Sequence, residues 1–366
     1  MRFDRTTIIF IIFALLIGGF FGYQQFVKNT PAQIFTVAVN PLAETWAKAA
    51  ADAYNASNPL VDNTQRVQVE IIVVDDLDVW QDRSGWTIND HPAGWLAGSS
   101  LSVDYLSQRT PYTTLVNSTA QTPLVWGGFA DRVDLLTADG AAFDWDAVQA
   151  AATAQTWRNF GSGTINGNIN IAINWATGSM AGVGALLSSA AAYDDTSAVT
   201  VDLTSSAEFR EWFQPINDSI FNSQRLGDNP ARTMSQRGAS AADMGLLPEV
   251  QWLETLTALN GRGEMTFAYP AYQFSLDFPM TAWQGGGSES WHRGAVQSFA
   301  NFLRGERGQA LAIETGLRPV SGRIDSTASL FVAGQAAGIG LIDVPGTVLD
   351  APAKNVVERL LALINS

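Results

Sequence analysis

The chain has 366 residues, of which 46% are hydrophobic and 15% charged, a composition typical of a folded protein whose length permits two lobes or domains. Its 35 acidic and 21 basic residues give a net charge of -14, which argues against nucleic acid as a partner because the phosphate backbone needs a basic face. The sequence contains no cysteine, which excludes disulfides, thiolate metal sites, cysteine nucleophiles and lipid attachment through an N-terminal cysteine.

The N-terminal residues 6–26 are apolar and uncharged, with two arginines before them and a lysine after them. About 20 apolar residues can cross a bilayer as a helix, and a cationic N-terminus stays in the cytoplasm. We therefore expect 1–30 to form a cytoplasmic tip, a transmembrane anchor and a linker, with the globular part extracytoplasmic. The alternative is a secreted protein after signal cleavage, but the nearest small-x-small site, Thr30-Pro31-Ala32, lies well past the apolar core and contains a proline.

The globular part opens with a strand–helix–strand pattern. Residues 34–39 predict a strand, Asn40-Pro41 breaks it, and 42–54 has helical spacing of apolar residues. A second strand at 67–74 ends in Asp75-Asp76. This spacing indicates a βαβ unit and a largely parallel sheet, and hence an α/β fold.

The stretch 169–192 combines a strand, a polar loop and a helix. Its isoleucines alternate with smaller residues, and Thr177-Gly178-Ser179 then opens a small-residue helix from about Met180. The first N–H groups of a helix lack intrahelical partners and carry the positive end of the dipole, which favours an oxyanion or a polar solute there. The alternative is that Thr177 or Ser179 is an ordinary N-cap.

Further elements follow the same periodicity rules. Short strands are expected at 123–126 and 264–269, and Pro215 should kink or divide one helix. The helices are expected at 140–157, 208–221, 246–259, 291–316 and 353–364.

Four segments in this order resemble the type II periplasmic solute-binding proteins, the extracellular receptors of ABC importers. They are AVNPLAETWAKAAADAYNASNP, WLAGSSLSVDY, TGSMAGVGALL, and the pair FAYPAYQFSLDFPM and FANFLRGERGQALAIETGLRPVSG. Two departures leave the substrate class open. Asn40 stands where many relatives have serine or threonine, and the cysteine of lipoprotein receptors is absent.

The resemblance implies a two-lobed α/β fold behind the transmembrane helix, without enzymatic activity or cofactor. Lobe one would comprise 34–126 and 268–345, lobe two 127–267, and a C-terminal helix 346–366. A small polar or anionic solute would be held between the lobes and passed to an ABC permease or reported to another membrane protein. A different class is an anchored sensor or adaptor of the same fold, whose cleft is vestigial and whose surface binds a protein.

The candidate solute-binding residues come from both proposed lobes. Asn40 offers an amide at a strand end, although Asn-Pro alone favours a turn. Ser99 and Ser100 follow an apolar strand, where open α/β sheets bind ligands. Thr177 and Ser179 would supply the second half of the site.

Aromatic residues near strand ends form a second group of candidates. Tyr269 and Tyr272 flank Pro270 and offer hydroxyls or a stacking face, with hinge packing as the alternative. Trp175 is assigned to packing, because most of the 12 tryptophans must be in a core or an interface. Glu249 is explained by its place in the first turn of a helix.

Catalytic and metal sites have weak support in the sequence. His91 and His292 are the only histidines and have no ligand at metal spacing. Gly178-Ser179-Met180-Ala181-Gly182 is superficially similar to a nucleophile elbow. A serine hydrolase using Ser179, with His292 as its only possible base, is the minor alternative.

Overall fold

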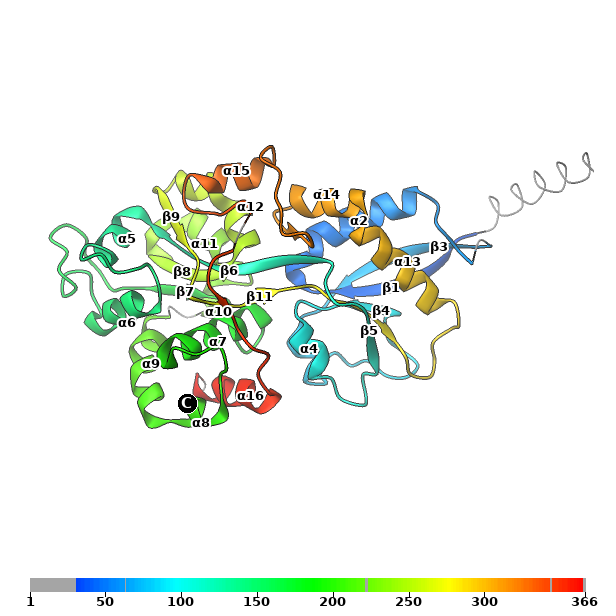
Figure 1. The fold of residues 1–366 in the computed structure, drawn as a ribbon, viewed down its shortest axis with the longest axis horizontal. Helices are drawn as coiled ribbons and strands as arrows, with labels where there is room; N and C mark the ends of the chain where they lie inside the picture. The colour runs from blue at the N-terminus through cyan, green and yellow to red at the C-terminus, as the bar shows by residue number, and fades with distance from the viewer. Residues whose placement is uncertain (1–30, 63, 221–222, 343, 365–366) are drawn as a thin grey trace, which may run out of the picture.

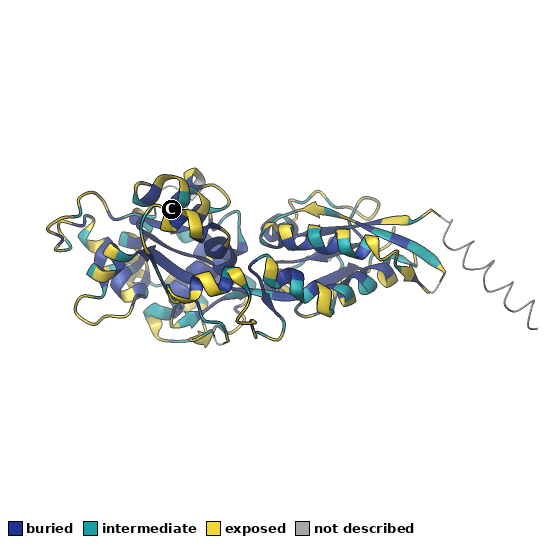
Figure 2. Ribbon diagram, turned by 90° about the horizontal axis from the view of Figure 1, so that it is seen from above, coloured by how far each residue is buried: buried dark blue, intermediate teal, exposed yellow. Residues whose placement is uncertain are grey.

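A computed structural model describes residues 31–62, 64–220, 223–342 and 344–364, which form two lobes (Figure 1). The expected membrane segment 6–26 lies outside the described residues. Among the helices that are described, none has the length and apolar character needed to cross a bilayer. Buried residues concentrate in the central sheets of both lobes, and exposed ones lie on the outer faces of the helices (Figure 2).

Lobe one is built on a six-stranded sheet. Strand β1 runs parallel to β3 and β4, and β12 runs antiparallel to β4 and β5. The expected strand–helix–strand unit is therefore confirmed. In sheet order the strands are β2 (Leu60–Val61), β3 (Gln65–Val73), β1 (Gln33–Val39), β4 (Gly94–Leu96), β12 (Met280–Trp283) and β5 (Tyr112–Val116).

Helices cover both faces of this sheet. Helices α2 (Glu44–Ala56), α13 (His292–Arg304) and α14 (Glu306–Glu314) pack together, with α2 on β3 and α13 on β1 and β12. Helix α3 (Asp76–Trp80) packs on α4 (Ser100–Asp104), which packs on β5. The short helix η1 (Pro41–Ala43) links β1 to α2.

Lobe two is built around the long strand β6 (Ala120–Phe129), which lies in the second sheet. Strand β6 follows β5 directly, β11 leads into β12, and the chain returns to lobe two after α14, so it crosses between the lobes three times (Figure 1). The remaining strands are β7 (Ile171–Ile173), β8 (Met244–Pro248), β9 (Met265–Ala268), β11 (Ser275–Leu276) and β13 (Arg318–Pro319), with a separate pair of β10 (Tyr272–Gln273) and β14 (Thr347–Val348).

Helix α7 (Met180–Asp194) lies at the centre of lobe two and is buried on nearly all sides. Its small residues allow this, because the ring of Phe274 lies 2.2 Å from where a Cβ of Gly184 would be. The C-terminal helix α16 (Lys354–Leu363) packs on α7 and α8. The other helices are α5 (Ala130–Leu136), α6 (Trp145–Ala154), α8 (Val201–Ser205), α9 (Ala207–Ser219), α10 (Ser223–Leu226), α11 (Pro230–Arg237), η2 (Gly238–Ser240), α12 (Glu249–Asn260) and α15 (Ser329–Gln335).

Three expected elements differ from the structure. The helix expected at 246–259 begins as the buried strand β8, which pairs with β6 and gives way to α12 after Pro248. A short apolar run has the same composition in a buried strand and a buried helix, so periodicity alone misassigned it. The helix expected at 291–316 is two helices that meet at Gly305. Pro215 does not divide α9, which runs on to Ser219, whereas a kink there stays a prediction; the residue four positions earlier is the exposed Glu211, whose carbonyl solvent can satisfy.

A buried ion pair ties the returning chain to lobe two. Arg318 on β13 donates from Nε to Glu249 Oε1 at 2.9 Å and from Nη2 to Oε2 at 2.8 Å, and both side chains are almost fully buried. The Tyr269 hydroxyl donates to Glu249 Oε2 at 2.7 Å and accepts from the Gly340 amide. Glu249 is therefore more than a first-turn acid, because it joins its own segment, which follows β8, to residues that follow β9 and α14.

We predict that Arg318→Met lowers the free energy of unfolding by about 3–5 kcal/mol, because it leaves the Glu249 carboxylate buried without its cation. The double variant Glu249→Leu/Arg318→Met should be less destabilised than Arg318→Met alone, and urea denaturation measures both. Arg307→Met is the control, because Arg307 pairs with Glu314 at the surface, where both side chains are 59% exposed. Equal stability of Arg318→Met and the control would contradict the assignment.

Candidate functional site

A pocket of about 200 Å³ lies between the lobes, and residues of both lobes line it. We call it the interlobe pocket. From lobe one come the loops that follow β1 and β3, with Asn40, Pro41, Leu42 and Asp75. From lobe two come the loop between β7 and α7 and the turn before α11, with Asn174, Trp175, Gly178, Ser179, Gly227 and Asp228.

The buried carboxylate of Asp76 holds the lobe-one loops in place. It accepts hydrogen bonds from Asn40 Nδ2 at 2.8 Å, from the Gly98 amide at 2.8 Å to each oxygen, and from the Ser99 amide at 3.1 Å. Burial raises the pKa of Asp76, and these hydrogen bonds oppose the shift. The loops after β1, β3 and β4 are thereby joined at one carboxylate.

The predicted residues Asn40 and Ser179 line the interlobe pocket. However, much of their hydrogen-bonding capacity is taken up by other groups of the protein. Besides its bond to Asp76, Asn40 accepts from the Leu42 amide at 3.0 Å and caps η1. Ser179 caps α7 by accepting from the Ala181 amide at 3.2 Å. Thr177 is half-buried, and it is absent from the described lining of the pocket although it precedes Gly178.

Ser99 and Ser100 line a separate pocket of about 300 Å³ beside the crossing strands, with Gln121, Gln273 and Asp277. We call it the hinge pocket. Ser99 caps α4 through its hydroxyl, and the Ser100 amide donates to Asp277 Oδ1 at 2.8 Å. Ser99 and Asn40 are therefore joined through Asp76, but both serines line a different pocket from Asn40.

Tyr269 and Tyr272 are absent from the described linings of both pockets between the lobes. Tyr269 belongs to the Glu249 and Arg318 cluster, and burial raises its pKa. The exposed Tyr272 hydroxyl donates to Asp195 Oδ1 at 2.7 Å. Both hydroxyls are engaged by protein groups.

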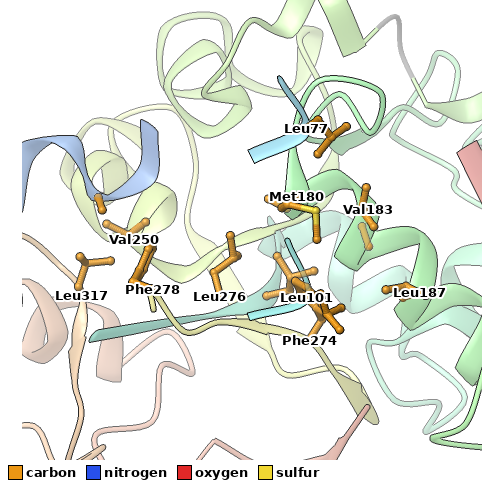
Figure 3. Packing of buried hydrophobic residues seen from close by; sticks show 14 of the residues in the cluster. Leu77, Leu101, Met180, Val183, Leu187, Val250, Phe274, Leu276, Phe278 and Leu317 are labelled. Carbon is orange, nitrogen blue, oxygen red and sulfur yellow. The ribbon is translucent and has the colours of Figure 1, made fainter. Parts of the chain in front are cut away.

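Apolar side chains of both lobes occupy the space beside these two pockets. Leu77 and Leu101 of lobe one belong to the same buried cluster as Met180 and Val183 of α7 (Figure 3). Phe274, before β11, lies in the same cluster and lines the hinge pocket. The lobes therefore meet through apolar side chains, and the interlobe pocket is a small space beside them.

Three residues that line the interlobe pocket were not predicted from the sequence as site residues, namely Asp75, Trp175 and Asp228. Burial and the charge of neighbouring Asp76 raise the pKa of Asp75 well above its ordinary range. Asp228 and the 43% exposed Trp175 face the same space from the other lobe. The Asp75-Asp76 pair at a strand end was visible in the sequence, whereas no local pattern marked Asp228.

A larger depression of about 700 Å³ lies on the outside of lobe two, between α6, the loop before β7 and α9. Its lining comes from one lobe alone, so movement of the lobes would not enclose a solute there. The smaller interlobe pocket is the better candidate because both lobes contribute to it.

The described residues offer little for catalysis or metal binding. The Ser179 hydroxyl caps a helix, while the His292 ring contacts Ser288 and Glu289 at the start of α13 in lobe one, so no described contact joins serine to histidine. Within the described residues, no group of three or more His, Cys, Asp or Glu side chains is arranged to hold a metal ion.

Comparison with known proteins gives structural matches only, since no protein-family model and no curated protein matches the chain. An extracellular solute-binding protein from Bordetella parapertussis matches with a TM-score of 0.57 and 12% identity, over 91% of this chain and 98% of that one. A periplasmic thiamin binding protein matches with a TM-score of 0.58 and 11% identity, over 91% and 95%.

A maltose/maltodextrin-binding domain from Bdellovibrio bacteriovorus, bound to maltotriose, matches with a TM-score of 0.57 and 11% identity, over 91% of this chain and 94% of that one. All three are described as binding proteins, and the ligands are theirs. The chain therefore has the two-lobe α/β fold of solute-binding proteins.

We predict that Asp76→Asn lowers the free energy of unfolding by about 2–3 kcal/mol, because an amide cannot accept at both positions from the Gly98, Ser99 and Asn40 donors. Urea denaturation measures the loss. Asp78→Asn on the same helix is the control, since Asp78 pairs with Arg83 where both side chains are nearly half exposed, and it should change stability by less than about 1 kcal/mol. Equal losses in the two variants would contradict the role given to Asp76.

Proposed function

We propose that the chain is a membrane-anchored, extracytoplasmic solute-binding protein that captures a small polar solute between its lobes for an ABC importer. The observation that carries this proposal is the interlobe pocket, whose walls come from strand-end loops of lobe one and from the start of α7 in lobe two. Open α/β sheets bind ligands at such strand ends. Asn40 and Ser179 remain proposed contacts, and Ser99 and Ser100 are proposed to contact solute from the hinge pocket side.

The paired crossing strands supply a hinge for this function. Strands β6 and β11 pair where the chain passes between the lobes, so few backbone torsions need to change for the lobes to move apart. A solute that contacts both walls binds the closed arrangement better than the open one, and this difference shifts the population towards closure. Closure would be the signal read by a permease.

The membrane anchor is part of the proposal. Residues 6–26 are apolar and are followed closely by the first described strand, β1, so the globular part would stand near the bilayer on its outer side. Tethering keeps the receptor beside a membrane partner and raises its effective concentration there.

A sensor or adaptor of the same fold is the second candidate, and the apolar contact between the lobes favours it. Leu77, Leu101, Met180 and Val183 are buried together and leave only small polar pockets beside them. A protein that acts through its surface needs no large solute cleft. The two candidates differ in whether any small solute binds.

We expect one solute class to raise the thermal unfolding temperature of the full-length chain in a polyoxyethylene detergent, which offers neither sugar nor ammonium groups. The series should include sugars, amino acids, oxyanions and ammonium compounds. A solute at 100 times its Kd adds about 2.7 kcal/mol of stability. Differential scanning fluorimetry measures the shift, and failure of every class would favour the sensor or adaptor.

The position of the site can be tested with matched bulky substitutions. Leu42→Trp adds volume to the wall of the interlobe pocket and should abolish the solute-dependent shift. Ile342→Trp makes a similar change at a side chain that is 61% exposed on the surface, and it should keep the shift. Loss of the shift in both variants, or in neither, would argue against this pocket.

We also predict that the full-length chain stays in the membrane fraction after washing with sodium carbonate at high pH, because an apolar helix is not released by removing charge contacts. A variant with two arginines in the centre of 6–26 should be released, since each arginine costs roughly 2.5–3.5 kcal/mol at the middle of the bilayer. Immunoblotting of both fractions is the measurement. Release of the unaltered chain would support signal cleavage and secretion.

A further inference from the structure

Both ionisable side chains among the described residues that line the interlobe pocket are acidic. Asp75 and Asp228 bring carboxylates from opposite lobes, and Asn174 brings an amide. Among the described residues lining the pocket, none is lysine, arginine or histidine. Such a lining suits a ligand that carries positive charge and donors, and it opposes an anion.

Asn174 adds an observation that is independent of the charges. Its Nδ2 donates to the backbone carbonyl of Asp228 at 3.0 Å, and Gln251 Nε2 donates to the same oxygen at 3.0 Å. These bonds hold the Asp228 turn beside the pocket. The Asn174 side chain is only 4% exposed, and its Oδ1 has no hydrogen-bond partner within the described structure. This oxygen is closed off from solvent, so a donor from a solute would pair with it only when the wall of the pocket moves to expose it.

Trp175 supplies an aromatic face to the same pocket. It remains 43% exposed, although it directly follows the buried Asn174. Its ring packs against Gly178, where a Cβ would come within 2.6 Å of the ring, so this glycine allows the ring its position. An exposed indole beside carboxylates attracts cations through the negative face of the ring.

The positive end of the α7 dipole favours an anion instead, but its charge is smaller than that of the carboxylates. A helix N-terminus is equivalent to roughly +0.5 charge, and Ser179 already caps it. Asp75 and Asp228 each carry a full negative charge when ionised, and the buried Asp76 lies next to Asp75. The carboxylates therefore set the sign of the potential in the pocket.

We propose that the interlobe pocket binds a small organic cation through the carboxylates of Asp75 and Asp228, the Asn174 amide oxygen and the indole face of Trp175. The proposal rests on the function proposed above and names its solute class. A bare divalent ion fits less well, because it needs about six oxygen ligands and no group of three acidic or histidine side chains is arranged for one among the described residues.

The test compares choline with its uncharged isostere 3,3-dimethylbutan-1-ol by isothermal titration calorimetry on the full-length chain in the same detergent. Putrescine, methylammonium, maltose, glycine and sulfate complete the series. A cation should bind at least about tenfold more tightly than any neutral or anionic compound in the series, because only a cation compensates the half-buried carboxylate of Asp75.

Asp75→Asn is the most informative variant. Asparagine caps a helix as well as aspartate does, so the bond to the Leu77 amide and the start of α3 are kept while the charge is lost. Its cation affinity should fall about tenfold or more. Asp134→Asn on α5 is the control, because it changes the net charge equally at an exposed position outside the pocket and should leave the affinity unchanged.

Variants of Trp175 distinguish the contribution of ring stacking from that of charge. Trp175→Ala should weaken cation binding by about 3- to 30-fold, and Trp175→Phe should restore part of the loss because it keeps an aromatic face. If the ring served only to pack the loop, both variants would change thermal stability without changing the preference for choline over its isostere. That result would show that Trp175 is not part of the binding site.

The affinity for choline should also fall as the pH is lowered, because choline does not titrate and protons compete with it for Asp75, whose pKa is raised. The charged groups around Asp75 are Asp76, Asp78 and Arg83 on its own side and Asp228 across the pocket. In Asp75→Asn this dependence should be reduced.

The outcomes separate the two proposals. Tighter binding of a sugar, glycine or sulfate than of any cation would overturn the cation assignment and leave solute capture standing. Absence of binding by every compound in this series and in the fluorimetry series would overturn both. Cation binding that survives Asp75→Asn and Trp175→Ala unchanged would overturn the assignment to this pocket.

Discussion

The lobe-one side of the cleft depends on the buried carboxylate of Asp76. Burying a charge is unfavourable unless hydrogen bonds replace its water, and here the replacements come from Asn40 and from the Gly98 and Ser99 amides. Gly98 is required for this closeness, because a Cβ there would lie 2.5 Å from the Asn40 amide nitrogen. The loops after β1 and β4 must therefore close around the end of β3.

This arrangement determines which residues are left for a solute. Asn40 and Ser99 direct polar groups to Asp76 and to helix caps, so their strand-end positions serve the protein first. Asp75 precedes Asp76 in sequence but turns to the interlobe pocket, where its described hydrogen bond is the cap to Leu77. Two adjacent aspartates thus have different roles, and the difference arises from the segments that pack against each of them.

The sequence predicted local elements better than it predicted partners. Alternation and helical spacing identified β1, α2, β3 and the start of α7, because each pattern repeats within a few residues. The pairings of Asn40 with Asp76 and of Glu249 with Arg318 join residues 36 and 69 positions apart, and no local pattern contains them. Tyr269 was visible as an aromatic at a strand end, but its partners Glu249 and Arg318 were brought to it by the fold.

Local patterns also do not reveal the charge of the pocket, because residues from distant segments line it together with the start of α7. The residues around Ser179 suggest an electropositive site, since the start of α7 presents unpaired amides. The field of a helix end falls off within a turn, whereas the acidic residues Asp75 and Asp228 reach the pocket from other segments. The sign of an interlobe site therefore depends on loops that only the folded chain brings to the helix, and a strand–loop–helix motif alone does not contain that information.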